Sequence, residues 1–184
     1  MNRLKIYFFD FVLPDIIRQN IISNRQELST IKNISLHLNL KRSGIRRENF
    51  LDGSLALYLI SGGRSIPNIA KRGNLNLNIQ KNDITGVSLI LSGEESWMFL
   101  DRLINIALPR LKDFRGINSS SWDTNRDLTF NIADLIAFPE LESNYDSFSH
   151  FKDMNITISM TSQNKALNLH TLQSMRLPFV NKIV

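Results

Sequence analysis

Three histidines and a few carboxylates are the side chains of this sequence that could carry acid–base or metal chemistry. His37, His150 and His170 lie far apart in the chain, and no two of them have the short spacing that metal-binding histidines commonly show. Asp101 and Asp113 lie on an expected helix and in the turn after it, beside arginines that would pair with them. The GxSxG, HExxH and glycine-rich dinucleotide patterns are absent. We therefore expect no catalytic residue, no metal and no cofactor.

Lysine and arginine are the second group with a chemistry of their own, because they bind phosphate. The net charge is +5, and residues 1–115 hold 17 Lys+Arg against 10 Asp+Glu. Four cations fall within residues 41–47, between an expected strand and an expected helix, which suits phosphate binding, although a solvated turn is the alternative. Two arginines and a lysine within residues 110–115 cannot be buried unpaired, so this segment is expected to face outward.

Hydrophobic periodicity predicts the elements that position these groups. Apolar residues at 34, 36, 38 and 40 alternate with polar ones, which indicates a half-buried strand with a polar face. Residues 71–85 are expected to form a long polar hairpin arm, and residues 140–153 a surface excursion. The aromatic and aliphatic residues of an expected helix at 7–20 are expected to be buried. Further strands are expected at 65–70, 86–91, 128–132 and 154–160, and further helices at 48–60, from 94 to a stop at Pro109, and at 164–177 with Ala166, Leu169, Leu172 and Met175 on one face.

Length and composition fit one globular domain. The 184 residues are 42% hydrophobic, contain no cysteine, and include no apolar run long enough to span a membrane. Together these features predict an α+β fold, with residues 1–184 as a single domain. Its mixed or antiparallel β-sheet of about five strands has helices packed on one face.

Several spaced motifs carry a resemblance to a known family. Residues 107–116 read ALPRLKDFRG, and SWD follows at 121–123. This segment resembles the uL5 family of large-subunit ribosomal proteins, whose members carry an (A/V)PR(I/L)xDFRG signature followed by SFD. Further motifs similar to the family's (I/L)(S/T)GQKP, FPE, DITI and FPF stand in the same order at residues 60–64, 138–140, 155–158 and 177–179. The resemblance covers almost the whole chain.

The resemblance implies a structural protein, not an enzyme, in the central protuberance of the large ribosomal subunit. Its implied partners are 5S or large-subunit rRNA, peptidyl-site tRNA, neighbouring large-subunit proteins and a protein of the small-subunit head, with no membrane and no small-molecule substrate. The residues expected to bind rRNA are His37, Asn39, Lys41, Arg42, Arg46, Arg47, Gly63, Arg64, Ser92, Arg110, Lys112 and Arg115. The residues of the arm expected to face tRNA are Lys71, Arg72, Asn74 and Lys81.

The departures from the family pattern fall at positions associated with 5S recognition. The family usually has asparagine in its first strand, glutamine in GQKP and threonine in TLRG, where this chain has His37, Gly63 and Ile90. The glycine-rich loop after the first strand is replaced by residues 39–44, and the arginine of LRG is Ser92. We therefore hypothesise that large-subunit RNA and protein neighbours, instead of 5S RNA, hold this chain.

Composition also bears on where the chain works. Asparagine and isoleucine are frequent, as an A/T-rich organelle genome would produce, and residues 7–16 already resemble the family's first helix, which leaves no room for a transit peptide. We expect synthesis inside an organelle, with the mitochondrion first and the plastid as the alternative. The rival functions are a non-ribosomal RNA-binding module or RNA chaperone, and a small α+β enzyme.

Overall fold

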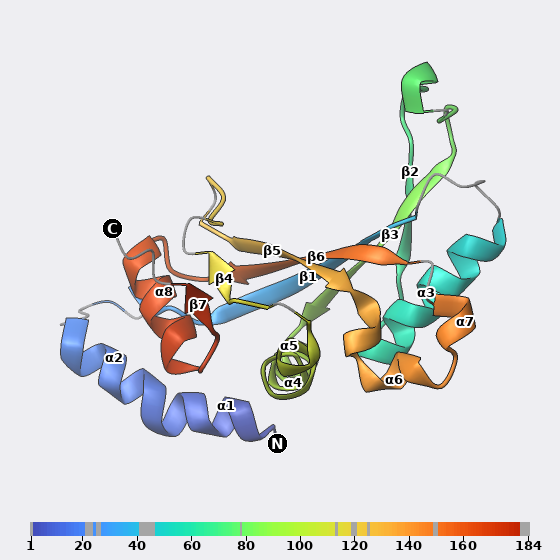
Figure 1. The fold of residues 1–184 in the computed structure, drawn as a ribbon. Coiled ribbons are helices and arrows are strands. Elements are labelled where there is room, and N and C mark those ends of the chain that lie inside the picture. Colours follow the sequence, from blue (N-terminus) through green and yellow to red (C-terminus); the bar gives the residue numbers. More distant parts are fainter. Residues whose placement is uncertain are drawn as a thin grey trace. The chain divides into compact units, whose positions relative to one another are not determined.

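A five-stranded antiparallel β-sheet and surrounding helices make up the fold, and the predicted α+β class is confirmed (Figure 1). The computed structural model describes residues 2–20, 24, 27–40, 47–77, 79–112, 114–118, 121–124, 126–148 and 151–180. The sheet has the strand order β2-β3-β1-β6-β5. Its strands are β1 Ile31–Asn39, β2 Ile66–Ile69, β3 Ile84–Ser92, β5 Leu128–Asp134 and β6 Lys152–Met160, and a separate parallel pair consists of β4 Ile117–Asn118 and β7 Phe179–Val180.

The helices alternate with these strands along the chain. Their bounds are α1 Arg3–Tyr7, η1 Phe8–Val12, α2 Leu13–Asn20, α3 Arg47–Ser61, η3 Leu75–Leu77, α4 Glu94–Arg102, η4 Leu103–Ala107, α5 Leu108–Arg110, η5 Leu135–Ala137, α6 Pro139–Glu142, α7 Tyr145–Phe148 and α8 Lys165–Ser174. Within the described part of the chain, no helix combines the length and the apolar character that crossing a membrane requires.

The chain forms two compact units. Unit 1 comprises Met1–Ile34, Ser92–Phe130 and Thr157–Val184, and unit 2 comprises Ser35–Leu91 and Asn131–Ile156. The boundaries therefore fall inside β1, β5 and β6 in the sequence, and before the last residue of β3. That residues 1–184 act as a single domain stays a prediction.

Two π-helical turns in unit 1 each stand directly before a proline. The backbone N–H of Leu13 bonds to the carbonyl of Phe8, and the N–H of Leu108 bonds to that of Leu103. The next residue is Pro14 in the first helix and Pro109 in the second. A proline inside a helix lacks an N–H and its ring clashes with the carbonyl four residues earlier, so the widened turn makes room for the ring.

The widened turn also explains the buried face of the N-terminal helix. Leu4, Phe8, Val12 and Ile16 are all buried and recur every four residues. In a regular α-helix four residues overshoot a full turn by about 40°, so this face would drift around the helix axis, and the wider π turn removes part of that drift. The helix begins at Arg3, where the Asn2 side chain caps it by accepting a hydrogen bond from the N–H of Leu4, so the prediction that it begins at residue 7 is wrong.

Two further predictions about these helices need correction. Pro109 does not end its helix, which continues through Arg110 and has Leu111 as its C-cap. The predicted burial is wrong for Ile17, which is 40% exposed, and for Phe9 and Phe11, which are 46% and 63% exposed. The two phenylalanines lie off the face that carries Phe8, although Phe9 still contacts Trp97, with their ring centroids 6.4 Å apart.

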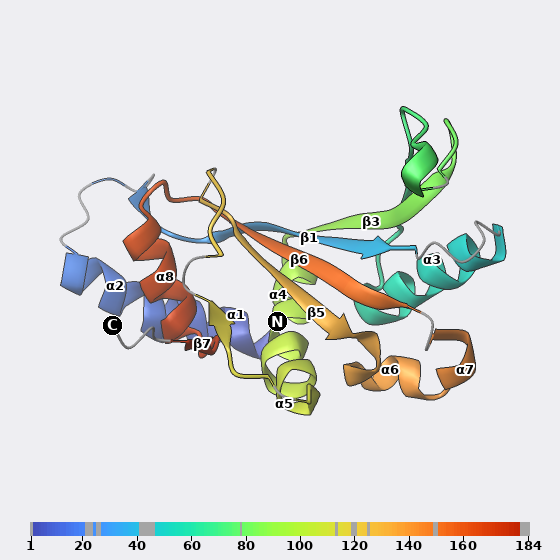
Figure 2. The ribbon, with the colours of Figure 1, turned by 45° about the horizontal axis from the view of Figure 1, so that its top comes forward.

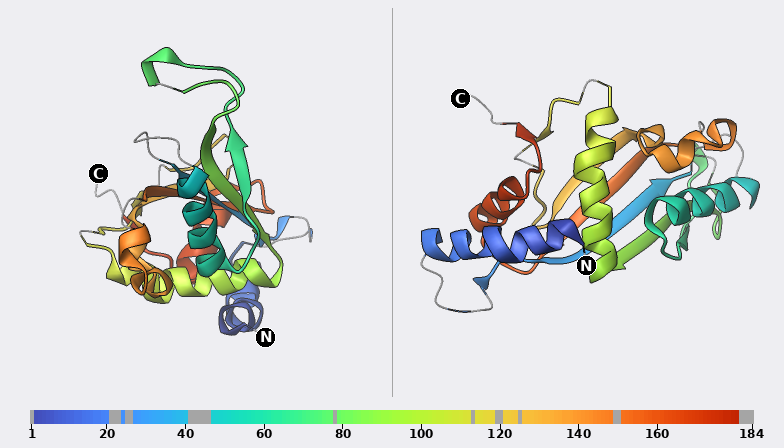
Figure 3. Two further views of the ribbon diagram at one scale, coloured as in Figure 1. Left: turned by 90° about the vertical axis from the view of Figure 1, so that its right-hand side faces the viewer. Right: turned by 90° about the horizontal axis from the view of Figure 1, so that it is seen from below.

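The helices α1 and α4 lie side by side in unit 1 (Figure 3, right). The rings of Phe8 and Trp97 pack with their centroids 5.1 Å apart. Arg3 pairs with Asp101 at 3.1 Å, and the Lys5 ammonium pairs with the Glu94 carboxylate. The α4–η4 helix buries one apolar face, which consists of Trp97, Leu100, Leu103 and Ala107.

The helix α8 buries a face that periodicity did not predict. Asn164 caps it by accepting a hydrogen bond from the N–H of Ala166, which is itself exposed. Asn168 is fully buried, where it accepts a hydrogen bond from the Ser29 hydroxyl at 2.6 Å and donates one to the Ser162 carbonyl at 2.9 Å. Of the predicted face, Leu172 and Met175 are buried, whereas Ala166 is exposed and Leu169 is half-buried. The prediction is therefore correct only for the C-terminal half of the helix.

Unit 2 is built around α3 (Figure 2). This helix packs against the sheet at Gly53, where an added Cβ would lie 3.0 Å from Leu40 and 3.5 Å from Val87. The short helices α6 and α7 pack against its other side and bury Leu141 and Phe148. The prediction that residues 140–153 form a surface excursion is therefore wrong, because Leu141, Phe148 and Phe151 in this segment are all buried.

Candidate nucleic-acid interface

A chain of hydrogen bonds crosses three strands of unit 2. The Nδ1 atom of His37 on β1 lies 2.8 Å from Nδ2 of Asn68 on β2, and its Nε2 atom lies 2.8 Å from Oδ1 of Asn39. The hydroxyl of Ser88 on β3 donates to Oδ1 of Asn68 at 2.8 Å. These four residues form what we call the strand-crossing network, which occupies the predicted polar face of β1.

The network implies one protonation state for the imidazole. The Asn68 amide oxygen accepts from Ser88, so its nitrogen donates to His37 Nδ1, which must then accept. The proton of the ring is therefore on Nε2, which donates to Asn39. Both ring nitrogens of His37 are thus engaged by partners within the chain.

Gly86 makes this crossing possible. Strand β3 lies between β1 and β2 in the sheet, and Gly86 pairs with Asn68. A Cβ atom at this position would lie 2.8 Å from the carbonyl oxygen of Leu38 and 3.2 Å from Cε1 of His37. Only glycine leaves room for the imidazole to pass over β3 and reach the next strand.

Two exposed isoleucines lie beside the network. Ile66, which stands opposite Ser88 in the β2–β3 register, and Ile90 are each 65% exposed. This face therefore joins amide and hydroxyl groups to apolar side chains and carries no charge at these positions. Such a surface suits the bases and riboses of irregular RNA better than it suits phosphates.

The predicted arm extends from β2 and β3 (Figure 1). Two hydrogen bonds close its base, from the N–H of Ala70 to Asp83 at 2.8 Å and from the N–H of Asn82 to Ala70 at 2.9 Å. The arm begins after β2 as predicted, but β3 starts at Ile84, so the arm is shorter than residues 71–85. The side chains of Lys71, Arg72, Asn74 and Lys81 are all exposed.

The cationic turn after α5 is a separate candidate surface, which belongs to unit 1. Arg110, Lys112 and Arg115 are exposed, as predicted for a segment that faces outward. Gly116 follows with a φ of +111°, and an added Cβ there would lie 3.1 Å from Cγ2 of Val180. This positive φ lets the turn reach β7.

The remaining residues predicted to bind rRNA differ in their exposure to solvent. Arg64 and Ser92 are exposed, whereas Gly63 is half-buried, and a Cβ on it would lie 2.9 Å from Cδ1 of Leu89. Lys41, Arg42 and Arg46 lie outside the described residues, as does the side chain of Arg47.

Among the predicted residues, the structure joins His37 and Asn39 by a hydrogen bond. Sequence reasoning missed Asn68, Ser88 and Gly86. A signal was present in Gly86, because a lone glycine in a β-branched strand often marks a close approach of two chain segments.

Comparisons with a family model and with individual proteins point to the same ribosomal protein family. The family model for the C-terminus of the ribosomal uL5 proteins matches residues 84–179. The chain is 33% identical over 180 residues to "Large ribosomal subunit protein uL5c" of Chara vulgaris, covering 97% of this chain and 94% of that protein. It is 34% identical over 165 residues to "Large ribosomal subunit protein uL5m" of Reclinomonas americana, covering 90% and 91%. It is 31% identical over 178 residues to "Large ribosomal subunit protein uL5" of Acaryochloris marina, covering 96% and 97%. The chain therefore belongs to the uL5 family of ribosomal proteins.

Proposed function

We propose that this protein works in the central protuberance of an organellar large ribosomal subunit, where it contacts 5S or large-subunit rRNA, the small-subunit head and peptidyl-site tRNA. Membership of the uL5 family makes it a structural constituent of the large subunit that binds ribosomal RNA and ribosomal proteins. The family is not enzymatic, which confirms the prediction that the chain is not an enzyme.

The exposed cationic turn is the observation that carries the proposed RNA contact. Arg110, Lys112 and Arg115 are exposed to solvent, and they lie in the segment that matches the family's signature. Cations in such a turn release counterions when they bind phosphate, which makes the affinity depend on salt. The strand-crossing network and its apolar neighbours add a surface suited to bases and riboses.

The structure also supports the proposal that the 5S contact is reduced. Both ring nitrogens of His37 are engaged by Asn68 and Asn39, and Gly63 has no side chain to offer and packs against Leu89. Large-subunit RNA and protein neighbours would then hold the chain in place of 5S RNA. An assembled ribosome in which His37 and Gly63 pack against an intact 5S loop would refute this part.

The arm is proposed to reach peptidyl-site tRNA. Lys71, Arg72, Asn74 and Lys81 are exposed along it, and Leu75 in η3 is 95% exposed. Three cations can contact phosphates, and an isolated apolar side chain can lie against a base or ribose. Loss of tRNA protection in ribosomes carrying alanine at Lys71 and Arg72 would support this contact.

The proposed location is the mitochondrion, with the plastid as the alternative. Relatives of the chain include mitochondrial and chloroplast uL5 forms. The frequency of asparagine and isoleucine supports an A/T-rich organelle genome. Fractionation of organelles followed by detection of the protein in ribosomal pellets would decide between the two.

Alanine substitution of both Arg110 and Arg115 tests the RNA contact. The matched control is Arg126→Ala, since Arg126 is also an exposed arginine of unit 1 outside the cationic turn. If each of the two arginines contacts one phosphate, the slope of log affinity against log salt should fall by about 1.4 to 1.8. The control should keep the wild-type slope, and both variants should keep the wild-type circular dichroism spectrum.

Incorporation into ribosomes is the second readout of that experiment. The double variant should co-sediment less with large subunits in sucrose gradients as salt is raised, whereas Arg126→Ala should sediment as the wild type does. An unchanged salt slope together with normal incorporation would contradict the proposed role of the turn. Unfolding of the double variant would instead show that these arginines serve as internal partners.

A further inference from the structure

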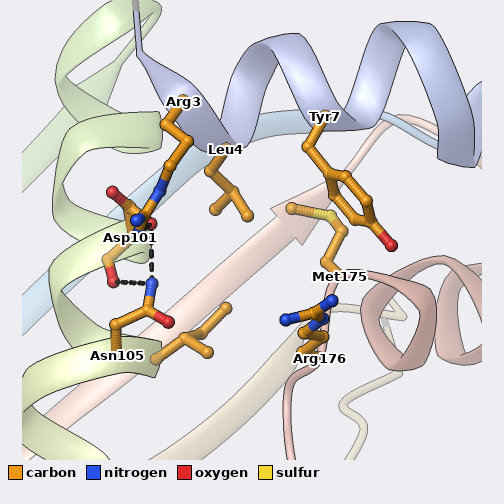
Figure 4. Close-up of a pocket in the computed structure, with 8 residues that line it drawn as sticks. Arg3, Leu4, Tyr7, Asp101, Asn105, Met175 and Arg176 are labelled. Carbon is orange, nitrogen blue, oxygen red and sulfur yellow. Dashed lines mark hydrogen bonds and ion pairs between the residues drawn. The ribbon is translucent and has the colours of Figure 1, made fainter.

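A pocket of about 240 Å³ lies in unit 1 between α1, the second half of the α4–η4 helix and the turn after α8 (Figure 4). Leu4, Ile104 and Met175 give it apolar walls, and Tyr7 contributes an aromatic ring. The polar groups come from all three elements. None of the interface residues described above lines it.

Arg176 occupies an unusual backbone position at this pocket. The turn after α8 is closed by hydrogen bonds from the N–H of Leu177 to Leu172 at 3.1 Å and from the N–H of Arg176 to Gln173 at 2.9 Å. Arg176 has a φ of +67°, the left-handed conformation that glycine usually provides after a helix. The turn itself gives no reason for an arginine here.

The guanidinium of Arg176 is available to a ligand. Its Cζ atom lies 5.8 Å from the centroid of the Tyr7 ring, and Figure 4 shows both side chains, together with Met175, across the pocket from Arg3 and Asp101. Within the residues that the structure describes, no carboxylate or other hydrogen-bond acceptor is recorded for this guanidinium. A planar cation beside an aromatic ring presents N–H donors that match a phosphate.

The other side of the pocket presents an acceptor beside a second cation. Oδ1 of Asp101 receives Nη2 of Arg3 at 3.1 Å and Nδ2 of Asn105 at 2.7 Å. These contacts hold the carboxylate in place, and the side chain of Arg3 remains 76% exposed. With two arginines and one aspartate, the lining carries a net positive charge.

We propose that this pocket receives one unpaired nucleotide of ribosomal RNA. Its phosphate contacts Arg176 and Arg3, its base lies against Leu4, Met175 and the Tyr7 ring, and a base or ribose hydrogen-bond donor faces Asp101. An acidic protein side chain would use the arginines but leave the apolar walls uncovered, so a nucleotide fits the lining better. This inference rests on the proposed ribosomal function.

The substitution Arg176→Gly separates ligand binding from folding. It removes the guanidinium but gives the turn the residue that its φ favours, so the fold is retained. Arg126→Gly is the matched control, because Arg126 is an exposed arginine with a φ of +65° and does not line the pocket. Both substitutions remove one cation and both relieve a left-handed backbone.

Titration of the full-length protein with adenosine, guanosine, cytidine and uridine monophosphates is the first measurement. The wild type should bind at least one of them, with NMR shift changes at Tyr7 and Met175. Because a hydrogen-bonded charged contact is lost, Arg176→Gly should weaken that binding by about tenfold or more, whereas Arg126→Gly should leave it unchanged. Binding that is weakened equally in both variants, or absent from the wild type, would overturn the proposal.

Ultraviolet crosslinking within assembled large subunits is the second measurement. A peptide containing Tyr7 should crosslink to one nucleotide of ribosomal RNA in the wild type and in Arg126→Gly, and the crosslink should be lost in Arg176→Gly. Subunits that contain the protein but give no such crosslink, or that place a protein peptide against Tyr7, would overturn the inference alone. Failure of the wild-type protein to co-sediment with large subunits would instead refute the proposed function.

Discussion

Replacing Gly86 with alanine tests whether the strand-crossing network depends on a missing side chain. The added Cβ would lie 2.8 Å from the Leu38 carbonyl and 3.2 Å from the His37 ring, so the backbone of two strands must move apart. Overpacking of this kind costs about 1–3 kcal/mol, and loss of the His37–Asn68 hydrogen bond costs about 1 kcal/mol more. The intrinsic preference for alanine over glycine returns about 0.5–1 kcal/mol.

The expected net loss is about 2 kcal/mol of unfolding free energy, which for a chain of this size lowers Tm by about 4–8 °C. Gly53→Ala is the control in the same unit, because its Cβ would meet the flexible end of Leu40 at 3.0 Å and alanine is the better helix former. That variant should be as stable as the wild type or more stable.

Urea denaturation and NMR of the imidazole together provide the assay. In the wild type the ring should show a protonated Nε2 and an unprotonated Nδ1, and in Gly86→Ala this pattern should be lost along with the stability. If Gly86→Ala has the wild-type unfolding midpoint and the wild-type imidazole spectrum, the argument from close approach is wrong. If the unfolding free energy of Gly53→Ala falls by the same amount, the loss of stability in Gly86→Ala cannot be assigned to close approach within the sheet.

Two further predictions concern unit 1. Asn168→Leu should lower the unfolding free energy by about 2–4 kcal/mol in urea titrations, because it leaves the buried Ser29 hydroxyl and the Ser162 carbonyl without their partner, and Ser29→Ala should cost clearly less. The hydrogen bond from Lys5 holds the pKa of Glu94 below its ordinary value of 4.5. The Lys5–Glu94 pair therefore stabilises the folded state fully above pH 4.5, and this stabilisation is lost as the pH falls through the lowered pKa of the folded state. Glu94→Gln should therefore lower Tm slightly at neutral pH and low salt, with no difference from the wild type at about pH 2. A Tm difference that does not change with pH would contradict this assignment.

The strands were predictable because one local pattern specifies them. The alternation of Leu36 and Leu38 with polar neighbours in β1, and of Ile156 and Ile158 in β6, corresponds to side chains that are fully buried. A residue in a strand changes face at each step, so alternation reports burial directly. Pro67 lacks an N–H and so favours an edge strand, and β2 lies at the edge of the sheet with a register shift after Asn68.

Helix faces were harder to predict because their burial depends on distant partners. Asn168 is buried because Ser29, far away in the sequence, supplies its hydrogen bond, and no periodicity of apolar residues reports such a pair. Phe9 and Phe11 were expected to be buried from residue type alone, yet the π turn and its buried face direct them outward. Helix propensity predicted that these helices form, but it did not predict which of their faces is buried.

The candidate interface also has a part that local sequence predicts and a part that depends on long-range structure. Exposure of Arg110 and Arg115 followed from the cost of burying an unpaired cation, which is a property of the residue itself. The strand-crossing network required knowledge that β3 lies between β1 and β2, and this order is a long-range property of the sheet. The role of Asn68 could not be predicted from the sequence for that reason, although Gly86 indicated the place where two strands approach each other.

The edge position of β2 has a consequence for the protein before it meets its ribosome. An unpaired strand edge normally invites another copy of the chain to add a strand, which leads to self-association. In β2 Pro67 offers no N–H to an incoming chain, and the bulge after Asn68 breaks the straight row of donors and acceptors. A newly made copy that waits for its RNA is thereby protected from polymerising along this side.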